Sequence, residues 1–184
     1  AGNNSLATGV SAVVAGDILI DTVDPTQSRV GEIVVNVEMF DSDSNLRDKR
    51  LRHDFLESTH WPFARFETTS IEGLDAVFAE GVEYEVSLTG NLTVKETTSE
   101  ETFTGTVTIT DGQLTANVSA EILSSTYDVG PIHVARLAHT EDEVTLTFAL
   151  VADRVSLDNT DEPNLDTDVP EFAISGGAFA GEVQ

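Results

Sequence analysis

The residue types that could hold a calcium ion gather in residues 41–45, whose sequence is DSDSN. The stretch begins like a calcium-binding loop, in which alternating carboxylate and amide oxygens ligate the ion. Leu46 stands where such a loop needs a glycine, and Arg52 stands where it needs the closing glutamate. We therefore expect no metal here, and we expect these acids to cap the start of a helix.

The rest of the chain has no recognisable catalytic or zinc-binding arrangement. His53 and His60 are seven residues apart and His133 and His139 fall in a predicted loop, so neither pair has the spacing of a zinc site. No serine lies in a G-x-S-x-G motif, and the chain has no cysteine. Carboxylates are so frequent that no pair stands out for acid–base catalysis. We expect neither an enzyme nor a cofactor.

Basic residues are few, and most of them lie close together. Five of the nine are Arg47, Lys49, Arg50, Arg52 and Arg65. They could form a site for an anion or a lipid head group, or they could neutralise the acids around them. The sequence leaves both interpretations open.

Composition and charge exclude several classes of partner. With 9 Lys and Arg against 33 Asp and Glu, the formal net charge is −24, which repels nucleic-acid phosphates and anionic membranes. Such acidity indicates adaptation to high salt, because salt screens the repulsion between like charges. The 184 residues, 40% of them hydrophobic, suit a single domain. Because of the charge, we expect no nucleic-acid partner.

The ends and the sequons of the chain bear on its location. No apolar run reaches the roughly 18 residues that a transmembrane helix needs, and the start AGNNS suits a mature chain after signal cleavage. Asn3, Asn91 and Asn117 each begin an N-x-S/T sequon. We therefore expect a secreted, cell-surface or periplasmic protein without a transmembrane segment.

The elements that must position these residues are strands. Apolar and polar residues alternate from Val82 to Val94, which is the pattern of a long antiparallel strand with one face in water. The alternation recurs over residues 33–39, 103–109, 114–122 and 144–150, and it is weaker near 12–20 and 63–71.

One segment departs from this alternation. Leu51 and Phe55 are four residues apart, which predicts a short helix at about residues 45–57. Many strands with one helix predict an all-β fold, an antiparallel barrel, because closure removes exposed sheet edges.

The chain changes character near residue 155. Residues 156–170 are rich in acids, contain two prolines and cannot bury a face, so they are predicted to form a linker. A strand-like stretch follows. We therefore divide the chain into a barrel of residues 1–155, an acidic linker of residues 156–170 and a C-terminal strand of residues 171–184.

The helix region carries a family resemblance. The sequence SNLRDKRLRHDFLESTHWPFARFETTSI, residues 44–71, resembles the signature of the YceI-like, polyisoprenoid-binding family. The matching positions are Asn45, Arg47, Asp48, Leu51, Arg52, Phe55, Leu56, Trp61, Pro62 and Phe66. The segments YEVSLTGNLTV (84–94) and SSTYDVG (124–130) continue the resemblance, which runs from about residue 12 to 155.

This resemblance implies a lipocalin-like barrel that holds a long apolar ligand in its lumen, in a non-enzymatic protein of the periplasm or cell exterior. The lumen positions that it implies are Tyr84, Leu88, Phe103, Val107 and Phe148. The same side chains could instead pack a filled core. The chain departs from the family at the turn KETTSEE (95–101), which is acidic where the family is usually basic.

The resemblance also indicates a strand missing from the N-terminus. The family opens with a strand of the type aromatic-x-Ile-Asp, and nothing before Gly9 supplies it. The tail EFAISGGAFAGEVQ resembles this strand, with Phe172, Ile174, Gly176 and Ala178 in alternation. The positions that we assign to the assembly strand are Phe172, Ile174, Ala178, Phe179 and Val183.

Two mechanisms would put the tail in the missing place. It could close its own barrel and leave a monomeric carrier of a long-chain apolar ligand, or it could enter the next subunit of a head-to-tail filament. Small residues such as Gly177 suit insertion between strands, and a 15-residue linker is longer than a hairpin needs. The sequence therefore favours donation, with another copy of this chain as the partner.

Overall fold

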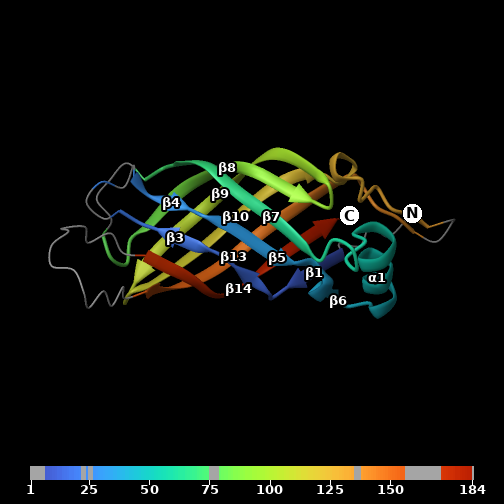
Figure 1. Ribbon diagram of the computed structural model, residues 1–184, viewed down its shortest axis with the longest axis horizontal. Coiled ribbons are helices and arrows are strands. Elements are labelled where there is room, and N and C mark those ends of the chain that lie inside the picture. The colour runs from blue at the N-terminus through green and yellow to red at the C-terminus, as the bar shows by residue number, and fades with distance from the viewer. Residues whose placement is uncertain are drawn as a thin grey trace, which may run out of the picture.

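Long antiparallel strands build the wall of the molecule (Figure 1). The structure, a computed structural model, describes residues 7–21, 24, 27–74, 79–134, 138–155 and 171–183. Consecutive neighbours in the sheet are β7 (Phe63–Glu72), β8 (Glu83–Val94), β9 (Thr97–Thr110), β10 (Gln113–Leu123) and β13 (Glu143–Val155). In β8 the apolar face of the alternation is buried, with Leu88 and Leu92 inside. The predicted antiparallel barrel is confirmed.

Two interrupted strands complete most of the remaining wall. The first consists of β1 (Ala7–Ser11), β2 (Val14–Ala15) and β3 (Asp17–Leu19), and the second of β4 (Arg29–Val30), β5 (Glu32–Asn36) and β6 (Asp41–Ser42). They run antiparallel, with β1 on β6, β2 on β5 and β3 on β4, and β5 joins β7. These are the regions whose alternation is weak or short in the sequence.

The C-terminal strand β14 (Glu171–Val183) closes the ring. One of its edges pairs with β13, from Val155 opposite Glu171 to Val144 opposite Val183. Its other edge pairs with β1 and β3, and the amide of Ile174 donates to the carbonyl of Gly16 at 3.0 Å between them. In this chain, therefore, the tail fills the place between the last barrel strand and the N-terminal one. The predicted linker, residues 156–170, lies outside the described residues, as does Asn3.

A β-bulge exchanges the two faces of β14 part-way along. The sequence predicts that Ile174, Gly176 and Ala178 share one face, but the register against β13 shifts and leaves Ser175 without a partner in the ladder. Beyond the bulge it is Phe179, only 6% exposed, that enters the core. The expected alternation is wrong after Ile174, because an inserted residue turns every following side chain to the other face.

The predicted helix covers one end of the barrel (Figure 1). It begins as α1 (Asn45–Arg50) and continues through a wider turn, η3 (Leu51–Phe55), in which the amide of Leu56 donates to the carbonyl of Leu51 at 2.7 Å. Leu51 and Leu56 pack on the core. Ser44 precedes the helix without making a side-chain cap. Within the described ranges, no helix has the length and apolarity needed to cross a membrane.

Shorter elements complete the described chain. They are the single turns η2 (Val37–Met39) and η4 (Ser124–Tyr127) and a small ribbon of β11 (His133–Val134) and β12 (Ala138–His139).

Gly177 lets β14 pass through its bulge, and its replacement tests whether the strand needs this backbone conformation. Its φ is +132°, and an added Cβ would lie 2.2 Å from the carbonyl oxygen of Ala149. We expect G177A to lower the free energy of unfolding by roughly 1–3 kcal/mol. Denaturant unfolding of G177A against wild type measures this difference.

The matched control is the preceding glycine. An added Cβ at Gly176 meets nothing within 4 Å, so G176A should unfold like the wild type within about 0.5 kcal/mol. Equal stability of G177A and G176A would contradict the structure of β14.

Candidate ligand-binding site

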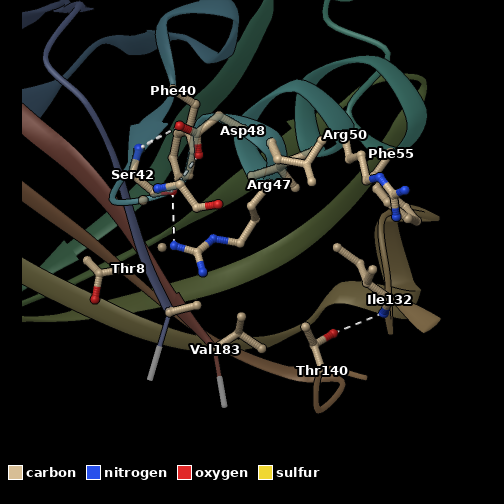
Figure 2. Close-up of a pocket in the computed structure, with 16 residues that line it drawn as sticks. Thr8, Phe40, Ser42, Arg47, Asp48, Arg50, Phe55, Ile132, Thr140 and Val183 are labelled. Atoms are coloured by element: carbon tan, nitrogen blue, oxygen red, sulfur yellow. Dashed lines mark hydrogen bonds between the residues drawn. The ribbon is translucent and has the colours of Figure 1, made fainter. Parts of the chain in front are cut away.

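An apolar cavity of about 380 Å³ opens at the barrel end that α1 covers. Figure 2 shows Arg47, Arg50 and Phe55 reaching into it from the helical segment, opposite Thr8 of β1 and Val183 of β14. The walls are mainly apolar, and the polar side chains among them include Arg47, Arg50 and the buried Asp48. The site is therefore a mouth with the helical segment on one side and strands from both ends of the chain, β1 and β14, on the other.

A second, deeper cavity of about 150 Å³ lies next to the mouth cavity, toward the barrel interior. The two share lining residues that come from distant parts of the chain, namely Phe40, Leu51, Ile132, Thr140, Gly181 and Val183. The two cavities are therefore adjacent and have these residues as a common wall.

Glycines on neighbouring strands line these cavities. An added Cβ at Gly181 would lie 3.5 Å from both Leu146 and Phe40, so the absent side chain leaves room between them. At Gly9 a Cβ would lie 2.0 Å from the ring of Phe40, so only glycine lets this ring lie against β1. The floor of the mouth thus depends on glycine in β1 and in β14.

A buried carboxylate fixes the corner between β6 and α1. Asp48 is 1% exposed and accepts hydrogen bonds from the hydroxyl of Ser42 and, at 3.2 Å, from its amide. Arg52 donates to the carbonyl of Phe40 at 3.0 Å. Burial alone would raise the pKa of Asp48, but the Ser42 hydrogen bonds and the nearby Arg52 hold it below its ordinary value of 3.8. The charged carboxylate therefore stabilises the wall that carries Phe40.

The basic residues divide between two roles. Arg65 pairs with Glu32 at 2.8 Å on the outside of the barrel, and Arg47 pairs with Asp43, so both neutralise acids. Of the five basic residues that the sequence singled out, Arg47 and Arg50 line the mouth cavity, and the anion-site interpretation stays a prediction.

Lys95, which begins the acidic turn between β8 and β9, has a structural role. The ammonium of Lys95 donates to the carbonyl of Phe55 at 3.1 Å, to the carbonyl of Asp128 at 2.9 Å and to the carboxylate of Glu57 at 3.1 Å. The Lys95 ammonium thus connects the end of the helical segment to the loop at Asp128, and Lys95 does not line the mouth cavity.

The predicted lumen residues lie deeper than the mouth. Phe103 and Phe148 belong to the packed centre of the barrel, whereas Leu88 and Val107 line a small cavity of about 40 Å³ toward the other end. Tyr84 is half-buried, and its hydroxyl accepts from the amide of Ala79 at 2.8 Å. None of these residues lines the two adjacent cavities, and their contact with a ligand stays a prediction.

Sequence reasoning missed most of the mouth residues. Ile132 and Thr140 come from a stretch without periodicity and are held together by backbone and side-chain hydrogen bonds of 3.0 and 2.9 Å. The sequence assigns Val183 to the assembly strand alone, because its alternation does not include the bulge that turns this residue inward. The sequence did indicate the helical side of the mouth, through the spacing of Leu51 and Phe55, the basic residues Arg47 and Arg50, and the family position Asp48.

The calcium-like stretch forms a strand-to-helix corner. Asp41 and Ser42 lie in β6, and Asn45 begins α1. The residues that the structure describes contain no group of three or more His, Cys, Asp or Glu side chains that could hold a metal ion.

Comparisons with known proteins agree on the fold. A model of the YceI-like domain matches residues 3–152. The crystal structure of BcnA from Burkholderia cenocepacia is similar, with a TM-score of 0.63 and 19% identity over 80% of this chain and 96% of that one. The YceI protein of Campylobacter jejuni gives a TM-score of 0.56 and 19% identity over 85% and 88% of the two chains. Among curated proteins the search finds no match.

The Asp48 network predicts a pH-dependent contribution to stability. Because its pKa is lowered in the folded protein, the carboxylate stabilises the fold above its unfolded value of 3.8 and loses this effect as the pH falls through the lower folded value. We expect D48N to lower the free energy of unfolding at neutral pH by about 1.5–3 kcal/mol.

Urea unfolding of both proteins over a pH series measures this effect. The difference between wild type and D48N should stay constant above about pH 5 and shrink below 3.8. E38Q, at an exposed position, serves as the control. A difference that is independent of pH would contradict the assigned ionisation of Asp48.

Proposed function

The chain belongs to the YceI-like domain family, and from this premise we propose that it is a non-enzymatic protein that binds the apolar part of a lipid at the mouth of its barrel. The apolar part would be an isoprenoid or another long hydrocarbon chain. The observation that carries the proposal is the pair of adjacent, mainly apolar cavities beneath α1.

The size and the chemistry of the two cavities suit such a chain. An apolar cavity of about 150 Å³ can take up a molecule as large as benzene, and the mouth cavity, at about 380 Å³, is larger. Burying hydrocarbon here removes apolar surface of both partners from water. Arg47 and Arg50 at the rim could bind an anionic or hydroxylated head group while the chain lies inside.

We propose further that the protein works outside the cytoplasm, in a salt-rich medium. Asn117 is exposed on β10 and Asn91 is half-buried on the outward face of β8, so both sequons face away from the core. The formal charge of −24 supports the high-salt setting, since added salt weakens the self-repulsion of a folded acidic chain.

Blocking the mouth tests the ligand proposal. Geranylgeraniol, a C20 prenol, should bind the wild-type protein in native mass spectrometry and in competition with a fluorescent fatty acid. G181V places methyl groups in the cavities and should weaken binding by about tenfold or more, since each displaced buried methylene contributes roughly 0.8 kcal/mol.

The control for this variant lies on the outside of the wall. Ala149 is exposed on β13, so A149V adds the same type of side chain without entering the cavities. Unchanged affinity in G181V, or equal loss in both variants, would sink the proposed location of the site.

A second candidate function is assembly by exchange of β14. Val155 and Glu171 lie opposite each other in the ladder, yet 15 residues connect them where a tight turn of a few residues would serve. A β14 donated by a neighbouring copy could make the same backbone pairings with β13 and β1, and a contact of this kind repeats into an open filament. Strand donation therefore remains a proposal beside closure within the chain.

The mass of the protein in solution separates these two arrangements. Donation predicts species heavier than the monomer that grow with protein concentration and with salt, because salt weakens repulsion between acidic copies. The chain ending at residue 170 should not polymerise, and it should bind an added peptide of residues 171–184. A full-length monomer at every concentration and salt level would contradict donation and leave closure within the chain.

A further inference from the structure

We propose that four phenylalanines form a partition across the barrel and set the maximum length of the hydrocarbon chain that it accepts. The partition consists of Phe66, Phe103, Phe148 and Phe179. This inference rests on the proposed function and adds the chain length of the ligand to it.

The four rings form a connected, buried layer. Their centroids lie 4.9 Å apart for Phe66 and Phe103, 5.0 Å for Phe103 and Phe148, and 4.8 Å for Phe148 and Phe179. Their exposed fractions range from 0% to 6%. Aromatic pairs at these separations attract one another beyond the area that they bury, so the layer resists opening.

The layer spans the part of the wall from β7 to β14, and the buried Ile33 and Val35 of β5 lie on the remaining side. Its members come from β7, β9, β13 and β14, which lie at different places around the ring. Leu92 of β8, 1% exposed, lies on the inward face beside it. A chain that enters from the mouth therefore meets packed side chains across the interior.

Cavities on the two sides of the layer are separate. The 150 Å³ cavity on the α1 side and the 40 Å³ cavity on the other side share no lining residue. Along β13, the first is lined by Leu146 and the second by Leu150, and Phe148 projects inward between these two. The ring of Phe148 thus stands directly between the two spaces.

The volumes on the mouth side then limit the ligand. If about 150 Å³ holds some six carbon atoms, as a benzene-binding cavity does, the 380 and 150 Å³ cavities together hold about 20. Any longer chain has to leave its remaining carbons outside the barrel. Affinity should therefore rise with chain length up to about C20 and then level off.

Removing the central ring should lengthen the site. F148A deletes the side chain that separates Leu146 from Leu150, so that the two cavities merge. We expect F148A to bind a C30 prenol about tenfold more tightly than the wild type does, with little change for C10.

The matched control removes a buried phenylalanine away from the partition. Phe172 is 2% exposed near the other end of β14 and lines neither cavity. F172A should resemble F148A in lost stability, since deleting a buried Phe costs about 3–5 kcal/mol, but should keep the wild-type length profile.

The experiment measures the affinities of C10, C15, C20, C30 and C40 prenols for the wild type, F148A and F172A. A plateau near C20 that F148A alone extends supports the partition. A wild-type affinity that keeps rising to C40, or identical profiles for all three proteins, would overturn it while leaving the proposed function intact. Absence of wild-type binding at every length would overturn both.

A wild-type measurement covers the case in which F148A does not fold. A C20 prenol with a photoreactive group at its chain end should label residues on the mouth side, such as Leu146 and Gly181. Labelling of Leu114 or Val118, which line the far cavity, would show that the chain passes the rings and would refute the inference.

Discussion

Closure of the sheet into a ring is the constraint on which the rest of the structure depends. Without β14, one edge of β13 and one of β1 would each present unpaired backbone groups, and the barrel would open beside the buried ring of Phe148. β14 pairs both edges and brings Phe179 against Phe148. It also supplies Gly181 and Val183 to the mouth. One terminal strand thus completes the sheet, the core and the candidate site.

Because β14 forms part of the site wall, lipid binding and strand exchange are coupled in the proposed function. A ligand that binds only the closed barrel stabilises the inserted strand by mass action, and a strand that leaves takes Gly181 and Val183 with it. A donated strand would rebuild the same wall in a neighbouring copy. The two proposals therefore describe one barrel interior, and they differ in whose chain supplies its last strand.

Sequence patterns predicted the elements whose residues show a regular spacing of apolar side chains. The alternation in β8 is strict, since one face meets water and the other the core, and the helix after Ser44 carried its own spacing. The bulge at Ser175 was not predicted, although Gly176 and Gly177 directly after it are a signal that could have indicated it, because glycine inside a strand often marks a bulge. Ile132 reaches the mouth only through tertiary packing. The sequence therefore indicated the helical side of the mouth, but the lumen residues that it assigned line neither of the two cavities there.

Amide hydrogen exchange of the dilute, monomeric protein tests the central claim, which is that β14 closes the barrel, most directly. If residues 171–183 are the strand that completes the ring, their amides should be protected to the same degree as those of β9 and β10, because all three open only when the barrel unfolds. Exchange of residues 171–183 at the rate of an unfolded chain, beside a protected β9 and β10, would contradict the account.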